Sequence, residues 1–406
     1  MKILITASEI DSNPRDETKN LNKVLLRIGK KPAVAHIIES YPEDTNFVVD
    51  LGNLTNQVRD LLSLAYPNRH IEYVNHGDSV FDTKEYSERH DISNPDSLRV
   101  LQHGGDESPG DLPKSDEALF IFDKFVIKFF KDKEIVKNRV SRGEILGDFV
   151  PKIEGVAGNF YRYEFIPGDL YAHIVQPNAD DFKKFLEWAQ NSFWREENEI
   201  SQKDFENICR SFYYDKTIKR INQFLEANGL EDTEHIINGE NVPTIEELLK
   251  RVDFDRLSNG LQSRFHGDFI LDNILKTNTG FCLLDWRQDF GGQLQGGDRY
   301  YDLAKLNHNL TVNHSVINQN LFSVIVDGNK IRVGIMRPSN LIECQTILFE
   351  FFRKYKYDNR KVRFLTALIW LNMSPLHHYP FNHFLYYFGK LNLWRALKEN
   401  DAARKK

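Results

Sequence analysis

The fold of this chain is decided by residues 265–286, which read FHGDFILDNILKTNTGFCLLDW. A polar loop lies between two apolar runs, and the Asn-Thr-Gly of residues 278–280 provides a turn because Asn and Gly tolerate positive φ. The pattern predicts a β-hairpin whose second strand ends on a carboxylate. We therefore expect Asp268, Asn273 and Asp285 to converge at one end of this hairpin.

These three side chains are the set that phosphoryl transfer needs. One aspartate lies beside the attacking hydroxyl and accepts its proton, while an asparagine and a second aspartate hold the Mg²⁺ that bridges the nucleotide phosphates. Protein kinases place the first two in a D-x-x-x-x-N loop, with the metal-binding aspartate one hairpin later. Asp268 and Asn273 have that spacing, and Asp285 ends the next strand.

The pattern H-G-D-x-x-x-x-N, followed by an apolar strand and L-D-W, resembles the aminoglycoside phosphotransferase and choline kinase superfamily. The resemblance implies a protein-kinase-like fold, ATP and Mg²⁺ as cofactors, and a small-molecule acceptor. Asp268 would be the catalytic residue, and Asn273 and Asp285 the metal ligands. Gly267 stands where protein kinases carry arginine, which favours the small-molecule branch. The alternative is a hairpin whose carboxylates cap turns and whose His266 is a core residue.

A second motif supports the same resemblance. Residues 297–304 read GDRYYDLA and match a G-D-x-x-x-D-L-A pattern that recurs in the superfamily. By this resemblance Asp302 braces the catalytic loop rather than binding metal, and His266 also supports the loop without touching the reacting groups.

Composition limits the remaining function classes. The 406 residues suffice for two or three domains, and a net charge of −6 with no long basic run before the C-terminal tail argues against a broad nucleic-acid surface. Three widely spaced cysteines, Cys209, Cys282 and Cys344, show no metal-binding spacing and indicate a reducing, cytoplasmic location. No apolar run of about 18 residues exists, so no membrane span is expected.

Residues 1–90 alternate strands and helices, which predicts a small parallel α/β sheet. Strands are expected at residues 3–7, 46–52 and 70–74, with helices at 33–40 and 55–65, the first beginning at Pro32. Lys23 and the Gly-Lys-Lys-Pro of residues 29–32 resemble part of a sugar-phosphate nucleotidyltransferase, but the glycines of its nucleotide loop are missing. The segment is interpreted as a truncated domain for docking or homo-oligomerisation, with Lys23 as a surviving nucleotide contact in the alternative.

Residues 91–170 are predicted to form the nucleotide-binding lobe. A linker is expected at residues 77–96, then a strand at 98–102, a glycine-containing loop at 103–116 and a hairpin at 118–130. Lys128 on the second hairpin strand matches the kinase lysine that contacts the α- and β-phosphates.

A helix at residues 133–146 would supply the glutamate that orients Lys128. Both Glu134 and Glu144 qualify, and Glu144 is favoured because an apolar pair and a strand follow it. Residues 161–168 resemble the hinge of the superfamily, where backbone groups around Glu164 and Ile166 would contact the adenine. The sequence leaves the choice between ATP and GTP open.

Residues 171–406 are predicted to form the helical lobe, which carries catalysis and acceptor binding. Apolar residues recur at helical spacing in residues 181–195, 203–214 and 217–228. A capping-like pattern at residues 244–247 begins another helix, and further helices are expected at 339–355 and 361–371. Arg287 replaces the glutamate of the superfamily's D-W-E and would hold a substrate phosphate or carboxylate, or pair with Asp289 or a helix carboxylate. Trp370, His377 and Tyr379, around a histidine pair between two prolines, would line the acceptor pocket or belong to the core.

The fold class expected is therefore α+β, a bilobal protein-kinase-like fold preceded by a truncated α/β domain. The function expected is ATP-dependent phosphorylation of a small-molecule hydroxyl, with a sugar or alditol of cell-surface polysaccharide (capsule) synthesis as the first candidate. Choline, ethanolamine or an aminoglycoside is the alternative acceptor. A non-catalytic nucleotide-binding pseudokinase is the alternative of another class.

Overall fold

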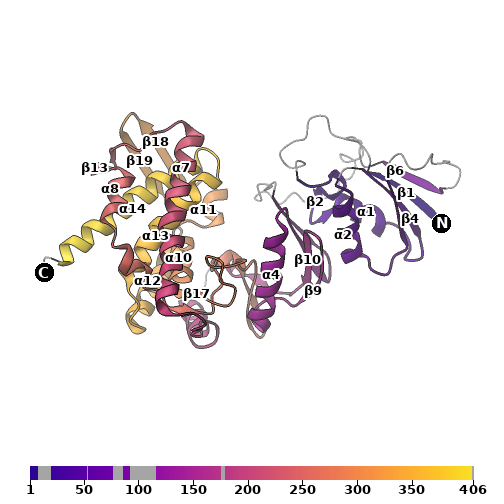
Figure 1. Cartoon of the computed structure of the whole chain (residues 1–406), viewed down its shortest axis with the longest axis horizontal. Helices are drawn as coiled ribbons and strands as arrows, with labels where there is room; N and C mark the ends of the chain where they lie inside the picture. Colours follow the sequence, from indigo (N-terminus) through magenta and orange to yellow (C-terminus); the bar gives the residue numbers. More distant parts are fainter. Residues whose placement is uncertain (8–19, 53, 76–85, 92–115, 175–178, 405–406) are drawn as a thin grey trace. The chain divides into compact units, whose positions relative to one another are not determined.

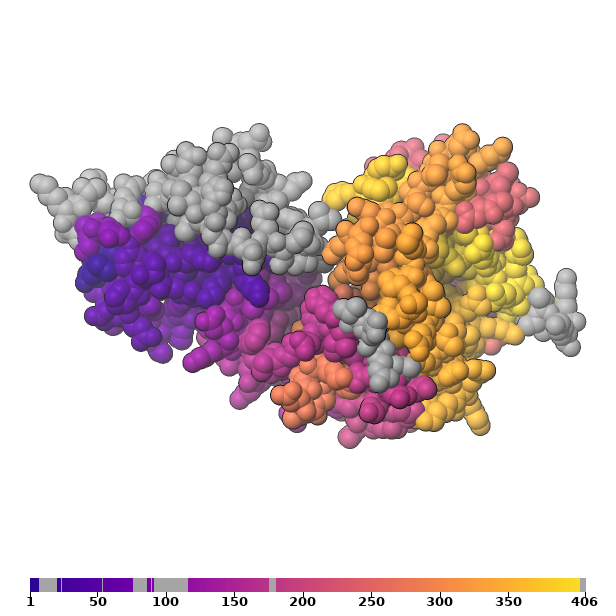
Figure 2. All heavy atoms as spheres, turned by 180° about the vertical axis from the view of Figure 1, so that it is seen from behind, coloured from indigo at the N-terminus to yellow at the C-terminus, as the bar shows by residue number. Residues whose placement is uncertain are grey.

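A computed structural model describes residues 1–7, 20–52, 54–75, 86–91, 116–174 and 179–404. They are coloured by position in the sequence in Figures 1 and 2. The chain divides into two compact units, residues 1–167 and 168–406. The division falls close to the predicted boundary at residue 170, and the first unit spans both of the first two predicted domains. The predicted strand at 98–102 and most of the glycine-containing loop after it lie outside the described residues.

The first unit begins with a parallel sheet, as the sequence predicted. Its order is β5-β4-β1-β6, and every adjacent pair is parallel. The strands are β1 (Lys2–Ala7), β4 (Asn46–Leu51), β5 (Ile71–Asn75) and β6 (Glu88–Asp91). The prediction of a linker throughout residues 77–96 is wrong at β6. An edge strand pairs on one side only and tolerates charged side chains, so its composition resembles that of a loop.

Helices α1 (Ala33–Glu39) and α2 (Thr55–Ala65) lie close to their predicted bounds, although Pro32 is the residue before α1 and not its first residue. Helix α2 buries Val58, Leu61, Leu62 and Ala65, which recur at helical spacing. Two short strands, β2 (Arg27–Ile28) and β3 (Lys31–Pro32), form a hairpin before α1.

An antiparallel sheet of order β7-β8-β10-β9 follows in the same unit. It consists of β7 (Glu117–Ile121), β8 (Phe125–Phe130), β9 (Ile153–Ala157) and β10 (Phe160–Glu164). Helix α4 (Lys133–Leu146) connects β8 to β9 and begins where the Asp132 side chain accepts a hydrogen bond from the backbone N–H of Glu134. The predicted hairpin and helix are both confirmed.

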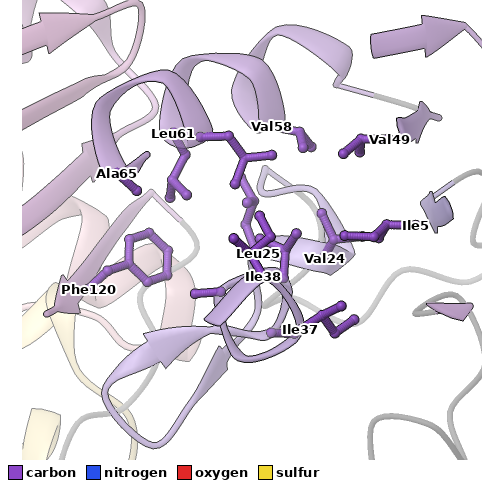
Figure 3. Packing of buried hydrophobic residues seen from close by; sticks show 14 of the residues in the cluster. Ile5, Val24, Leu25, Ile37, Ile38, Val49, Val58, Leu61, Ala65 and Phe120 are labelled. Carbon is purple, nitrogen blue, oxygen red and sulfur yellow. The ribbon is translucent and has the colours of Figure 1, made fainter. Parts of the chain in front are cut away.

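The two sheets of the first unit share one hydrophobic core. Ile5, Val49 and Leu61 belong to the same buried cluster as Phe120 and Phe129 of the antiparallel sheet. Figure 3 shows Phe120 near Ala65 of α2, with Ile5 and Val49 of the parallel sheet at the other side of the same cluster. The N-terminal segment therefore packs as part of the fold that carries β7–β10, and not as a separate globule.

This shared core predicts that Leu61→Ala weakens both sheets together. Removing a fully buried leucine side chain is expected to lower the free energy of unfolding by about 2–5 kcal/mol. Hydrogen exchange followed by mass spectrometry should show faster exchange in β8 and β10 as well as in β1 and β4. Asn56→Ala, at an exposed position of α2, is the control. Loss of protection confined to residues 1–75 would contradict a common core.

The second unit contains the predicted catalytic hairpin. Strands β15 (Ile274–Thr277) and β16 (Gly280–Leu283) are antiparallel, and β11 (Asp169–Leu170) pairs with β15. Two further short strands of this unit, β14 (Gln262–Ser263) and β17 (Gly297–Asp298), pair with each other.

Helices make up most of the second unit. They are α5 (Ala179–Trp188), α6 (Gln202–Arg210), α7 (Lys216–Asn228), α8 (Ile245–Arg251), α9 (Phe254–Ser258), α10 (Arg299–Asn309), α11 (His314–Asn318), α12 (Ser339–Lys354), α13 (Asn359–Met373) and α14 (Phe381–Arg404). The predicted helices are confirmed, but π-helical turns at Ala189–Phe193 and Ser211–Asp215 follow α5 and α6. Among the helices of the described residues, none has the length and apolarity needed to cross a membrane.

One sheet of the second unit was not predicted. Its order is β13-β12-β19-β18, built from β12 (His235–Ile237), β13 (Glu240–Val242), β18 (Phe322–Asp327) and β19 (Lys330–Ile335). Figure 1 shows β13, β18 and β19 at one end of this unit. β12 and β13 have only three residues each and give little sequence signal, and β12 pairs with β19 across a long stretch of intervening chain.

Candidate functional site

The predicted catalytic loop, residues 265–273, and the β15–β16 hairpin bring Asp268, Asn273 and Asp285 together. Asn273 ends a 3₁₀ turn, Leu271–Asn273, immediately before β15. Its side-chain amide donates to Asp268 Oδ2 at 2.9 Å and to the Asp268 carbonyl oxygen at 3.0 Å. Across the hairpin, the Leu284 N–H donates to the Asn273 carbonyl oxygen at 2.7 Å, which places Asp285 beside the loop.

Asp285 adopts a backbone conformation that is uncommon for a residue other than glycine. Its φ is 54°, in the left-handed region, where aspartate is tolerated better than most residues. The turn redirects the chain after β16, and the Asp285 charge interacts unfavourably with Asp268. Non-glycine residues in this region are concentrated at functional sites.

Helix α10 contacts the predicted catalytic loop through Asp302. The fully buried Asp302 carboxylate accepts hydrogen bonds from the backbone N–H groups of His266 at 2.8 Å and Gly267 at 2.7 Å. It also accepts from the Trp194 indole at 3.1 Å. The His266 ring contacts the Leu284 carbonyl oxygen at 2.8 Å, so it links the loop to the end of the hairpin.

Two further residues of α10 reach the catalytic loop, and the sequence analysis missed both. Lys305 Nζ lies 2.6 Å from Asp268 Oδ1. The Asn309 side chain accepts from the Leu271 N–H at 3.0 Å and donates to Asp272 Oδ2 at 2.8 Å. Asp302, Lys305 and Asn309 recur at helical spacing and therefore lie on one face of α10. That polar stripe is the signal that would have identified them.

The ion pair keeps Asp268 charged. Burial acts to raise the pKa of Asp268, but the Lys305 ammonium outweighs it, so the pKa of the carboxyl lies below its ordinary value. Burial likewise acts to lower the pKa of Lys305, and the attraction of Asp268 raises it above its ordinary value. Both groups are therefore ionised at neutral pH.

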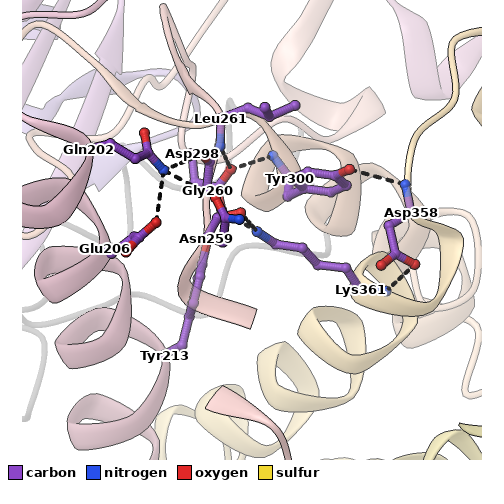
Figure 4. A network of polar contacts seen from close by, with 10 residues as sticks. All are labelled: Gln202, Glu206, Tyr213, Asn259, Gly260, Leu261, Asp298, Tyr300, Asp358 and Lys361. Atoms are coloured by element: carbon purple, nitrogen blue, oxygen red, sulfur yellow. Dashed lines mark hydrogen bonds and ion pairs between the residues drawn. The ribbon is translucent and has the colours of Figure 1, made fainter. Parts of the chain in front are cut away.

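A second buried aspartate, Asp298, anchors the start of α10. Its carboxylate accepts from the Tyr213 hydroxyl at 2.7 Å and from the backbone N–H groups of Leu261 and Tyr300 at 3.0 Å, and Lys361 Nζ lies 3.4 Å away. Figure 4 shows this network of polar contacts. Through Tyr213 it fixes the π-helical turn Ser211–Asp215 to the helix that supports the catalytic loop.

Arg287 lies directly against the catalytic loop. Its N–H donates to the His266 carbonyl oxygen at 2.9 Å, and its Nε donates to the backbone carbonyl oxygen of Asp289 at 3.0 Å. A Cβ on Gly267, whose φ is +85°, would lie only 2.5 Å from Arg287 Cβ. A glycine is thus required at residue 267 by both the backbone conformation and the Arg287 stem.

The structure does not bring Lys128 and its predicted glutamate together. Lys128 is buried on β8, with Nζ 5.2 Å from the Phe130 ring centroid. Glu134 and Glu144 are both exposed, and no ion pair joins either of these described residues to Lys128. The face of α4 that packs inward carries Val136, Arg139, Arg142 and Leu146, so helical phase turns Glu144 to solvent.

The remaining predicted residues occupy varied positions. Glu164 is the exposed last residue of β10, its N–H donating to the Lys152 carbonyl oxygen at 3.0 Å, and Ile166 follows, half-buried. Trp370 is 5% exposed and packs against Phe388 of α14. His377 packs edge-on against Phe381, whereas Tyr379 is 70% exposed. Trp370 and Tyr379 thus lie in different environments, one in the core and one at the surface.

The donor set of the hairpin suits Mg²⁺ held together with phosphates. Mg²⁺ prefers oxygen ligands and is typically bound by one or two carboxylates plus substrate phosphates. Asp285 offers a carboxylate, and Asn273 an amide oxygen whose orientation is fixed by its two N–H donations to Asp268. Within the described ranges, no group of three or more His, Cys, Asp or Glu residues could hold a metal ion without such additional ligands.

Comparison with known proteins gives structural matches only. No family model and no curated protein sequence matches the chain. A candidate fructosamine-3-kinase from Thermobifida fusca is 13% identical, with 67% of this chain and 85% of that chain covered and a TM-score of 0.40. Plasmodium vivax ethanolamine kinase is 14% identical, with coverages of 80% and 95% and a TM-score of 0.38.

The complex of streptomycin and ATP with APH(2")-IIa is 12% identical, with coverages of 74% and 96% and a TM-score of 0.38.

Proposed function

We propose that this protein is an ATP- and Mg²⁺-dependent phosphotransferase that phosphorylates a hydroxyl of a small molecule. The observation that carries the proposal is the convergence of Asp268, Asn273 and Asp285 at one end of the β15–β16 hairpin. Two acidic groups and an amide in this order are the parts that phosphoryl transfer uses.

Asp268 accepts the proton of the acceptor hydroxyl in this proposal. Asn273 and Lys305 each bind one of its carboxylate oxygens, at 2.9 and 2.6 Å, and so fix its orientation. Lys305 also keeps the carboxyl ionised at the pH where transfer takes place. A base held in one orientation saves the entropy of aligning it with the hydroxyl, which contributes to the rate.

Asn273 and Asp285 would hold Mg²⁺, which when bound neutralises charge on the transferred phosphoryl group. The chain supplies the positions of these ligands through the Asn273 amide contacts and the Asp285 turn. Lys128, Glu164 and Ile166 of the first unit are proposed to contact ATP, as the sequence suggested.

A sugar or alditol of cell-surface polysaccharide synthesis is the acceptor class that we propose first. Its support is the nucleotidyltransferase-like sequence of the N-terminal segment and the parallel sheet found there. ATP turnover measured over a panel of sugars, alditols, their phosphate esters and carboxylates, choline, ethanolamine and aminoglycosides tests the proposal. Absence of phosphorylated product with every acceptor would favour the pseudokinase alternative.

The Lys305–Asp268 pair predicts a specific pH dependence. In Lys305→Met the burial of Asp268 is no longer opposed, so the pKa of Asp268 should rise and the acid limb of kcat/KM should move to higher pH. The stability contributed by the pair is present in full between the ordinary pKa values, 3.8 for Asp268 and 10.5 for Lys305. It is lost as the pH falls through the lowered pKa of Asp268 or rises through the raised pKa of Lys305.

The measurement is the pH profile of kcat/KM for Lys305→Met, with Lys219→Met, at an exposed lysine of α7, as the control. If the acid limb lies at the same pH in the wild type, Lys305→Met and Lys219→Met, Asp268 is not the group whose titration causes it.

A further inference from the structure

Three cationic side chains gather beside the catalytic loop. Lys216 begins α7, directly after the π-helical turn Ser211–Asp215, and Arg220 follows one helical turn later. Lys216 Nζ lies 4.1 Å and Arg287 Cζ 5.1 Å from the centroid of the same Phe212 ring. One aromatic ring thus holds two of the three cations together.

Carboxylates of the protein do not balance this charge. Within the described part of the chain, no ion pair joins Lys216, Arg220 or Arg287 to a carboxylate, and the Arg287 guanidinium donates to a backbone carbonyl oxygen. The nearby Lys305 is already paired with Asp268.

The lowered pKa of Lys216 reflects its burial and this excess of positive charge. Burial and then the charges of Arg287, Arg220 and Lys305 lower the pKa of Lys216 well below its ordinary value, opposed by Asp289. Burial and Arg287 likewise lower the pKa of Arg220, opposed by Tyr301. An anion placed among these groups would relieve the repulsion.

A pocket opens at the same place. Its volume is about 400 Å³, and its lining comprises Asn207, Ile208, Ser211, Phe212, Lys216 and Gly291. Asn207, Ser211 and Lys216 provide hydrogen-bond donors, which are suited to anionic oxygens. A π-helical turn forms part of the wall, and such turns are frequent at functional sites.

The pocket is connected to the catalytic aspartate through neighbouring residues. Phe212 lines the pocket and lies under the Arg287 guanidinium. The stem of Arg287 covers Gly267, the residue before Asp268. A molecule in the pocket with a hydroxyl directed at Asp268 would therefore have its other end among the cations.

We propose that the acceptor alcohol carries an anionic group, a phosphate ester or a carboxylate, which is bound by Lys216, Arg220 and Arg287. That this anion belongs to the acceptor rests on the proposed phosphotransferase function, whereas the anion site itself does not. The planar fork of an arginine donates two parallel hydrogen bonds to phosphate or carboxylate, and charge-assisted bonds are about twice as strong as neutral ones.

Matched pairs of probes test the site by equilibrium calorimetry. Glycerol 3-phosphate is compared with glycerol, and gluconate with glucose, so that phosphate and carboxylate are examined separately. In the wild type the anionic member of at least one pair should bind at least about tenfold more tightly, which corresponds to 1.4 kcal/mol. The combined variant Lys216→Met, Arg220→Met should lose this advantage while neutral probes bind as before.

The chain offers a matched control for these substitutions. Lys219→Met removes an exposed charge from the same helix and should leave anion binding unchanged. Lys216→Met removes a partly buried cation that other cations repel. The unfolding temperature of this variant should therefore be equal to or above that of the wild type. A lower unfolding temperature would mean that Lys216 is a structural group and would overturn its assignment to the anion site.

Three other outcomes would overturn the proposal. The wild type prefers neither anionic probe over its neutral counterpart, or Lys219→Met weakens binding of the anionic probes as much as the double variant does. In the third outcome the double variant weakens the binding of ATP and not that of the anionic probes. Asp268→Asn separates this proposal from the function proposed above. It should bind the anionic probes but transfer the phosphoryl group about 10²–10⁴-fold more slowly than the wild type. A wild type that binds them yet phosphorylates no alcohol retains the anion site and refutes the phosphotransferase.

Discussion

Asp268→Asn is expected to lower the rate of phosphoryl transfer by about 10²–10⁴-fold, the contribution typical of a general base. An amide has nearly the same shape as a carboxylate but accepts no proton at neutral pH. The substitution also removes the negative charge that pairs with Lys305 Nζ at 2.6 Å. The affinity for ATP should change little, because in the proposed mechanism Asn273 and Asp285, and not Asp268, hold the metal beneath the phosphates.

Transfer is measured with the best acceptor of the panel, and ATP binding by calorimetry on the same preparations. Asp255→Asn is the control, since its side chain is 93% exposed and pairs with Arg210 at the surface. Turnover that survives in Asp268→Asn would remove Asp268 from the role of base. Equal loss of ATP binding would assign it to the nucleotide site instead.

Asp302→Ala is expected to lower the free energy of unfolding of the second unit by at least about 3 kcal/mol, since each buried donor left without an acceptor costs roughly 1–3 kcal/mol. Three donors lose their acceptor together: the backbone N–H groups of His266 and Gly267 and the indole of Trp194. Two of the three lie in the catalytic loop itself, so the loop should lose its fixed conformation and transfer should fall with stability.

Urea unfolding followed by tryptophan fluorescence reports on this unit because Trp194 and Trp286 are buried within it. The control is Asp255→Ala, which removes only a surface ion pair with Arg210 and should stay within about 0.5 kcal/mol of the wild type. A stable Asp302→Ala variant with full activity would show that the loop is held by other contacts.

Local sequence was sufficient to predict the β15–β16 hairpin. The turn residues, the apolar strands and the D-x-x-x-x-N spacing all act within a short stretch of chain, so Asp268, Asn273 and Asp285 were found before any contact was known. The parallel sheet of the N-terminal segment was predicted for a similar reason, since strand–helix alternation is a local pattern.

Contacts between distant segments were not predictable in the same way. The phase of α4 relative to its sheet turns Glu144 outward and Arg139 inward, and helical spacing alone does not fix that rotation. β12 finds β19 across a long stretch of chain, and β6 has the composition of a loop. Each outcome depends on which surfaces pack together in the folded chain.

The sequence by itself determined the order of the proposed catalytic groups and the types of most elements, because turn chemistry and hydrophobic periodicity act between near neighbours. Only the tertiary structure decided that Lys305 pairs with Asp268, that Phe120 shares a core with Leu61, and that Lys216 and Arg287 lie over one ring. Such pairs arise when packing brings distant parts of the chain into contact, and no local pattern records which partner a buried charge or apolar side chain will meet.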